Sequence, residues 1–120
     1  MTLGQILEEI VLRVEGAVYA SCVGNDGIAL SQHIKEVQFD PAVIDAEIAN
    51  IIGVTLRASE SIDGGKLNEI LFMTQKYTVL VRPVNSDVYF VLVLSGTIQN
   101  LGLARIEAKK IIPKIKEILS

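Results

Sequence analysis

Two residues in this chain have side chains suited to catalysis, but no partner for either is evident from the sequence. His33 is the only histidine and Cys22 the only cysteine among the 120 residues. A histidine can act as a general base and a cysteine as a nucleophile, but both roles require further groups at defined positions. We therefore expect His33 to lie in a polar loop and Cys22 to pack as a small apolar side chain.

Metal and phosphate sites are not indicated either. A single cysteine and a single histidine exclude an internal disulfide and a cysteine- or histidine-rich metal centre. Glu8 and Glu9 are adjacent, so on a helix their side chains diverge by about 100°. Gly64-Gly65 is not followed by the Lys-Ser/Thr pair of a phosphate-binding loop. The sequence therefore predicts a protein that is not an enzyme and that has no cofactor or metal.

Composition narrows the class of protein further. Fourteen acidic and 11 basic residues give a net charge of −3, which argues against a nucleic-acid partner. No apolar run is long enough for membrane insertion, and the amphipathic start differs from a signal peptide, so we expect a cytoplasmic protein. Half of the residues are apolar. A domain this small leaves part of such a surface uncovered, which favours self-association.

The spacing of apolar residues predicts helices and strands in the order helix, strand, strand, helix, strand, strand, strand, helix. The helices are expected at 3–14, 41–61 and from 101 onward, and the strands at 17–23, 28–31, 67–74, 77–84 and 88–94. Short links imply an antiparallel sheet, and the last strand is apolar on both faces. We expect a single α+β domain over residues 1–120, a five-stranded antiparallel sheet with helices on both faces. Pro113 predicts a kink or break in the last helix.

The second helix is apolar on more than one side, which a helix lying on a single sheet does not need. Besides a stripe of large side chains, it carries a stripe of small ones that would let another backbone approach closely. The third strand, whose centre is apolar on both faces, is expected at a sheet edge that needs a partner. We expect a second copy to pair with this strand and place the two long helices side by side. The predicted interface consists of Ala42, Ala46, Ala49, Gly53, Ile70, Leu71, Phe72 and Met73.

Three stretches of the chain resemble a known family. Residues 6–10 (Ile-Leu-Glu-Glu-Ile) lead into Val-Glu-Gly-Ala-Val at 14–18 and Asn-Asp-Gly-Ile-Ala-Leu-Ser at 25–31. A long helix follows, and residues 100–105 (Asn-Leu-Gly-Leu-Ala-Arg) begin the last helix. In order and spacing these stretches resemble the roadblock/dynein light-chain domain over nearly the whole chain. The family fold, a five-stranded antiparallel sheet with helices on both faces, agrees with the elements predicted above.

The resemblance implies a function that composition cannot indicate. Roadblock domains form homodimers or heterodimers and serve as non-catalytic platforms, and in bacteria and archaea they pair with small Ras-like GTPases and regulate them. We therefore expect a homodimer that binds a small Ras-like GTPase. The candidate partner contacts on the second helix are Asp45, Glu47, Asn50 and Arg57, with Arg57 as a possible arginine finger.

Two alternatives stay open. A scaffold subunit with non-GTPase partners would bind its partner equally with GDP and GTP. A small-ligand sensor would need a pocket with convergent polar groups.

Overall fold

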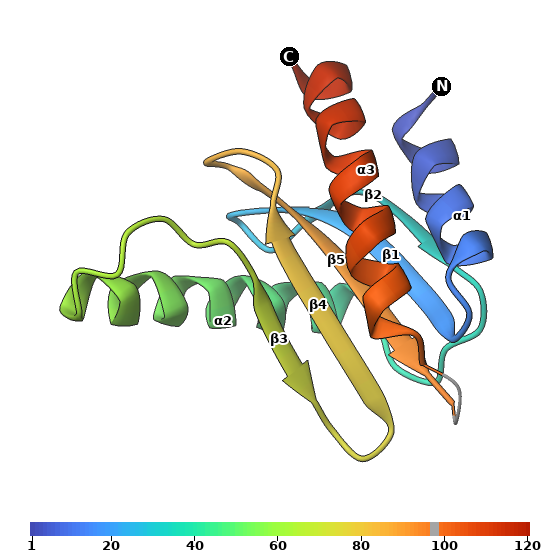
Figure 1. Cartoon of the computed structure of the whole chain (residues 1–120), viewed down its shortest axis with the longest axis horizontal. Helices are drawn as coiled ribbons and strands as arrows, with labels where there is room; N and C mark the ends of the chain where they lie inside the picture. The colour runs from blue at the N-terminus through green and yellow to red at the C-terminus, as the bar shows by residue number, and fades with distance from the viewer. Residues whose placement is uncertain (97–98) are drawn as a thin grey trace.

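A five-stranded antiparallel sheet lies between two layers of helices in the computed structural model, which describes residues 1–96 and 99–120 (Figure 1). The strands are ordered β2-β1-β5-β4-β3 across the sheet. The elements follow the chain as α1 (Leu3–Arg13), β1 (Ala17–Gly24), β2 (Ala29–Ile34), α2 (Pro41–Ser61), β3 (Ile70–Met73), β4 (Tyr77–Pro83), β5 (Val88–Ser95) and α3 (Leu101–Leu119). The predicted α+β class, element order and antiparallel pairing are confirmed.

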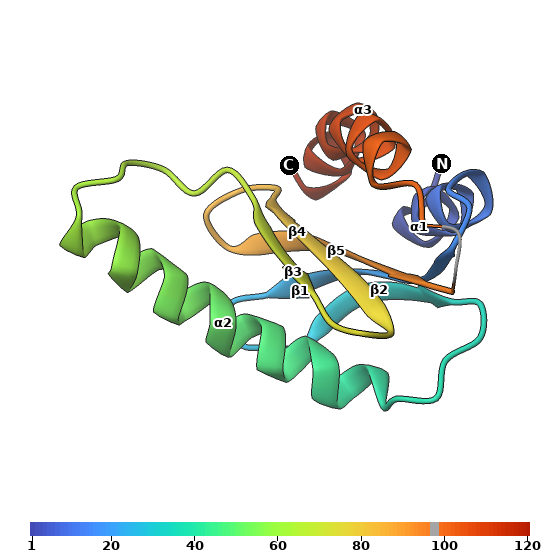
Figure 2. The same ribbon diagram turned by 60° about the horizontal axis from the view of Figure 1, so that its bottom comes forward.

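The helices cover both faces of the sheet, as the apolar last strand predicted. Figure 2 shows α1 and α3 on one face and α2 alone on the other. β5 is buried at seven of its eight positions because it is the central strand. Phe90 and Leu92 belong to the core under α1 and α3, whereas Val91 and Val93 belong to the core under α2. Burial on both faces accounts for the unbroken apolar sequence of this strand.

Side chains cap all three helices at their first turns. The Thr2 hydroxyl accepts a bond from the Gln5 amide nitrogen, and Gln5 Oε1 accepts one from Thr2 N at 2.8 Å, so the predicted capping box is present. Asp40 caps α2 by accepting from Ala42 N, and Asn100 caps α3. These bonds satisfy backbone donors that have no partner within the helix.

The second and third strands differ in extent from the sequence prediction. Ile28 belongs to the β1–β2 turn, where its N–H donates to Asp26 Oδ1 at 3.0 Å, so β2 begins at Ala29. Pairing with β1 continues beyond Ser31, and it places His33 in the strand opposite Ala20 rather than in a loop. β3 is shorter than expected because its pairing with β4 begins only at Ile70.

The last helix passes through Pro113 without a break and ends at Leu119. Its apolar stripe, which includes the buried Ala104, Ala108, Ile111 and Ile115, holds the helix against the sheet on both sides of the proline. Packing therefore compensates for the backbone hydrogen bond that proline cannot make.

Candidate interaction surface

Helix α2 is attached to the sheet through its first half. Ile48 and Ile52 are buried against β-strand residues that include Val79 and Val91. The neighbouring Phe39, in the segment before α2, packs edge-to-face between the rings of Tyr19 and Tyr77, at centroid distances of 5.9 and 5.5 Å. These contacts hold the first half of α2 on the sheet and so set the direction of its second half.

Asp45, expected at an exposed position, is buried, so this part of the prediction is wrong. Its carboxylate accepts hydrogen bonds from Tyr19 Oη at 2.6 Å and Ser21 Oγ at 3.0 Å, both on β1. Two hydroxyl donors let a carboxylate occupy a buried position that would otherwise be costly. Asp45 therefore joins α2 to the sheet and is not available to a partner.

Burial also changes the acidity of this group. Desolvation raises the pKa of Asp45 above its usual value, and the bonds from Tyr19 and Ser21 lower it only in part. The pKa of Tyr19 is raised as well, mainly by burial. Tyr19 Oη also lies 3.0 Å from Oε1 of Gln32 on β2, so the network links α2 to two strands.

The second half of α2 is not supported by the sheet. Within Pro41–Ser61, which the structure describes in full, Ile52 is the last buried residue. Figures 1 and 2 both show the C-terminal part of the helix extending past β3, the edge strand. Leu56 is 39% exposed there, and Ile62 beyond the helix is 79% exposed. This overhang leaves apolar side chains without a covering layer.

The other three predicted partner contacts are exposed, as expected. Glu47, Asn50 and Arg57 lie on the side of α2 that faces away from the sheet. Val43 and Val54 are also more than half exposed on this helix. The outer face of α2 therefore combines charged, polar and aliphatic groups.

The stripe of small residues on α2 has a role inside the chain. Gly27, in the β1–β2 turn, is buried and lies against Ala46 and Ala49. A Cβ atom at Gly27 would lie only 3.1 Å from Ala46 Cα. The close approach that the stripe predicts thus occurs at Ala46 and Ala49, but with the chain's own turn. Ala42 is exposed, and a Cβ atom added at Gly53 would lie 3.6 Å from Nη1 of Arg57 on the same helix.

Strand β3 has the predicted position at the edge of the sheet. Ile70 and Phe72 pack toward the core under α2, and Leu71 packs toward the opposite core. Met73 is 69% exposed. The apolar pattern on both faces is therefore real, and the backbone groups on the outer side of β3 have no strand partner within the described chain.

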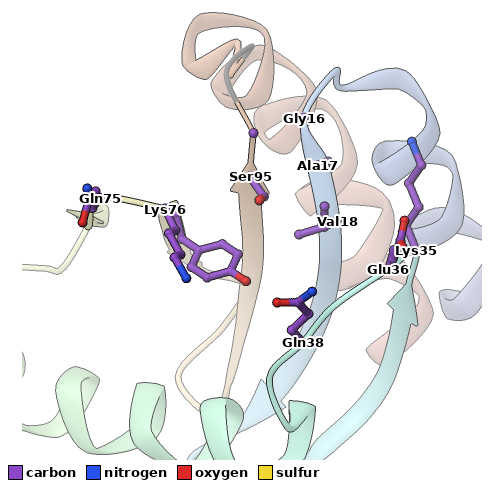
Figure 3. Close-up of a pocket in the computed structure, with 11 residues that line it drawn as sticks. Gly16, Ala17, Val18, Lys35, Glu36, Gln38, Gln75, Lys76 and Ser95 are labelled. Atoms are coloured by element: carbon purple, nitrogen blue, oxygen red, sulfur yellow. The ribbon is translucent and has the colours of Figure 1, made fainter.

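A second feature is an open cleft of about 710 Å³ at one end of the sheet (Figure 3). Lys35, Glu36 and Gln38 lie on one side of it, and Gln75 and Lys76 lie on the other. The charged ends of the two lysines do not converge on a common centre. The two lysines therefore do not form a joint site for an anionic ligand.

An ionic cluster centred on Glu69 is not indicated by any pattern in the sequence. Its carboxylate accepts a bond from Arg82 Nη1 at 2.8 Å and is bound by Arg105, with Nη2 at 2.7 Å. These bonds, led by that from Arg105, hold the pKa of Glu69 below its usual value. The three residues are 13 to 36 positions apart in sequence, so no local pattern indicates their contact.

Cys22 is fully buried, and burial raises the pKa of its thiol to about 12. Such a thiol is not a nucleophile at neutral pH. Over residues 1–96 and 99–120, no three His, Cys, Asp or Glu side chains form a group that could hold a metal ion. None of the helices in these residues has the length and apolar character needed to cross a membrane.

Known proteins share this architecture. No model of a protein family matches the chain, and no curated protein is significantly similar to it. Among solved structures, a Roadblock/LC7 domain from Streptomyces avermitilis is similar over 99% of this chain and 98% of its own, with a TM-score of 0.88 and 16% identity. The chain has the roadblock/LC7 fold, and the resemblance seen in the sequence is confirmed.

Individual proteins of this fold are also similar to the chain. MglB from Myxococcus xanthus has a TM-score of 0.86 at 16% identity, covering 97% of this chain and 93% of its own. MglC from the same organism has a TM-score of 0.69 at 28% identity and covers 98% of both chains. Profilin IA of Acanthamoeba castellanii has a TM-score of 0.64 at 16% identity, covering 97% and 98%. The architecture alone therefore does not decide function.

Proposed function

We propose that this chain is a non-catalytic, dimeric interaction platform that binds and regulates a small Ras-like GTPase. The overhang of α2 beyond the unpaired edge strand β3 is the observation that carries the proposal. The roadblock/LC7 fold supports it, because the resemblance in the sequence implies the same role.

A dimer would cover the exposed apolar side chains of the overhang and pair the open edge of β3. Antiparallel pairing of β3 with β3 of a second copy would satisfy the open backbone groups and join two five-stranded sheets. Each overhanging half of α2 would then lie under the sheet of the other copy. Leu56, on the sheet side of the helix, would become covered in this arrangement, and so would Ile62. The result is a two-fold interface in which the same surface is used by both copies.

The partner surface is the outer face of the two α2 helices. In the dimer these helices lie near one another, so Glu47, Asn50 and Arg57 of both copies would contribute to one surface. A platform of this kind regulates a GTPase by binding one arrangement of its switch loops more tightly than the other. The size of the effect is limited by that difference in affinity.

The oligomeric state tests the dimer. We expect wild-type protein to have twice the chain mass of 13.1 kDa by light scattering after gel filtration. Leu56→Arg should yield monomer, because the guanidinium would enter the covered interface. Leu12→Arg is the matched control, since Leu12 is 68% exposed on α1, away from α2. A monomeric wild type, or a Leu56→Arg variant that stays dimeric, would contradict the proposed interface.

Nucleotide dependence tests the GTPase role. The wild-type protein should capture a small GTPase from the lysate of its source organism, with a preference for either GDP or a non-hydrolysable GTP analogue. Arg57→Glu should reduce that capture, whereas Lys114→Glu, on the opposite face, should not. A GTPase bound equally in both nucleotide states would favour the scaffold instead. The absence of any GTPase among the captured proteins would refute the proposed partner.

A further inference from the structure

A small cleft lies on the face of the sheet opposite α2. It has a volume of about 270 Å³ and is formed by α3, the end of β4 and the segment that precedes β3. Its lining residues are Asn68, Arg82, Pro83, Lys109, Ile112 and Pro113. The cleft is separate from the outer face of α2, so it is independent of the proposed GTPase surface.

The charges around this cleft are not balanced. Glu69 is the carboxylate that binds both Arg82 and Arg105, and one negative charge cannot neutralise two guanidinium groups. Lys109 adds a third positive charge, and no acidic group among the described residues lies within 4 Å of it. The cluster therefore keeps an excess of about two positive charges, which would attract an anionic group.

The positive charge continues along one side of α3. Arg105, Lys109 and Lys116 are spaced by four and seven residues, which places them on the same side of a helix. Residues 101–120 contain five basic and two acidic side chains, whereas the whole chain has a net charge of −3. The basic surface is thus a local feature of an acidic protein.

The cleft also offers apolar contacts. Ile112, Pro83 and Pro113 supply an apolar wall. A phosphate group makes no use of an apolar wall, whereas a peptide can supply a carboxylate and an apolar side chain together.

We propose that this cleft binds an extended acidic peptide segment of a partner protein. A carboxylate side chain of the segment pairs with Lys109 and the exposed edge of Arg82. The next side chain, an aliphatic one, lies against Ile112 and the two prolines. The side-chain amide of Asn68 forms hydrogen bonds with the peptide backbone.

Selection from a random 12-residue peptide library displayed on phage tests the proposal, with the intact chain as bait. Peptides that bind the wild-type protein should be enriched in aspartate or glutamate next to leucine, isoleucine or valine. A synthetic copy of the most enriched peptide should bind Lys109→Glu roughly five- to tenfold more weakly, because a surface ion pair becomes a like-charge contact. Lys114→Glu, the same charge change on another side of α3, should bind it as wild type does.

Several outcomes would overturn the proposal. Enrichment of neutral or basic peptides, or no enrichment, excludes an acidic peptide partner. Equal affinity of the selected peptide for wild type and Lys109→Glu places its site elsewhere. A second experiment measures binding of the chain to vesicles of phosphatidylserine and phosphatidylcholine. If they bind the wild-type chain and not Lys109→Glu while no acidic peptide is enriched, a membrane is the partner. The monomeric Leu56→Arg variant should bind the peptide as well as wild type does. Failure of the proposed dimer can therefore be distinguished from failure of the proposed peptide site.

Discussion

The contact between the β1–β2 turn and α2 makes a quantitative prediction about Gly27→Ala. Gly27 has a φ of +81°, and the added Cβ would lie 3.1 Å from Ala46 Cα and 3.6 Å from Ala49 Cβ. Gly65→Ala is the matched control. Gly65 has nearly the same φ, +80°, but an added Cβ there would meet no described atom within 4 Å. Both variants therefore place an alanine at the same positive φ, but only Gly27→Ala also brings its Cβ atom against another element.

The magnitudes follow from these two contributions. An alanine at positive φ costs about 1–2 kcal/mol, and the reduced entropy of the unfolded chain offsets about 0.4–1 kcal/mol. Gly65→Ala should therefore lower the free energy of unfolding by about 1 kcal/mol. Gly27→Ala adds a contact with backbone that cannot move independently, and overpacking of this kind costs about 1–3 kcal/mol. Its total loss should be about 2–4 kcal/mol.

Urea denaturation followed by circular dichroism measures both values. Equal slopes with urea concentration would indicate that the variants differ in stability alone. If the two losses agree to within about 0.5 kcal/mol, the turn does not pack against α2 as described, and the explanation of the small-residue stripe fails.

Two further variants test the buried and half-buried carboxylates. Because the pKa of Asp45 is raised in the folded state, its contribution to stability is greatest below the unfolded value of about 3.9 and declines as the pH rises through the folded value. Asp45→Asn should remove this decline, so the stability of wild type relative to the variant should fall as the pH rises above about 4 in urea titrations. A difference in the free energy of unfolding between wild type and Asp45→Asn that does not change with pH would contradict this account of Asp45. Glu69 has a lowered pKa, so its contribution is present above about pH 4.3 and is lost as the pH falls through the folded value. Glu69→Gln should therefore cost about 1–3 kcal/mol at neutral pH and less at pH 3, as measured by the same titrations. The cost comes from the bond with Arg82, whose side chain is 19% exposed, because water screens the bond with Arg105, which is 40% exposed, more strongly.

Local chemistry accounts for what the sequence predicted correctly. The Thr2–Gln5 capping box, the Asp40 and Asn100 caps and the apolar pattern of β5 are short-range signals, and each occurs in the structure. Together with short connections they were sufficient to predict the antiparallel sheet with helices on both faces. The position of β3 at an edge followed from its order in the chain.

The interaction surface was less predictable because it depends on contacts between distant residues. Asp45 was expected to be exposed on its helix, and its burial depends on two hydroxyl groups 24 and 26 residues earlier in the chain. The small residues of α2 were expected to contact a second copy, which stays a prediction. Two of them, Ala46 and Ala49, lie against the chain's own β1–β2 turn, because a periodic pattern does not specify which backbone approaches. The Arg82–Glu69–Arg105 cluster combines side chains from β4, α3 and the segment before β3.

The order of the strands also has a consequence for how the chain is synthesised. β1 pairs with β5, so Cys22 lies opposite Phe90, 68 residues later. While a ribosome extends the chain, the apolar β1 has only the edge strand β2 beside it until residues 88–95 emerge. The centre of the sheet can therefore form only after residues 88–95 have left the ribosome. Such distant pairing slows folding and prolongs exposure of an aggregation-prone strand, so the growing chain should be a substrate for chaperones that bind at the ribosome.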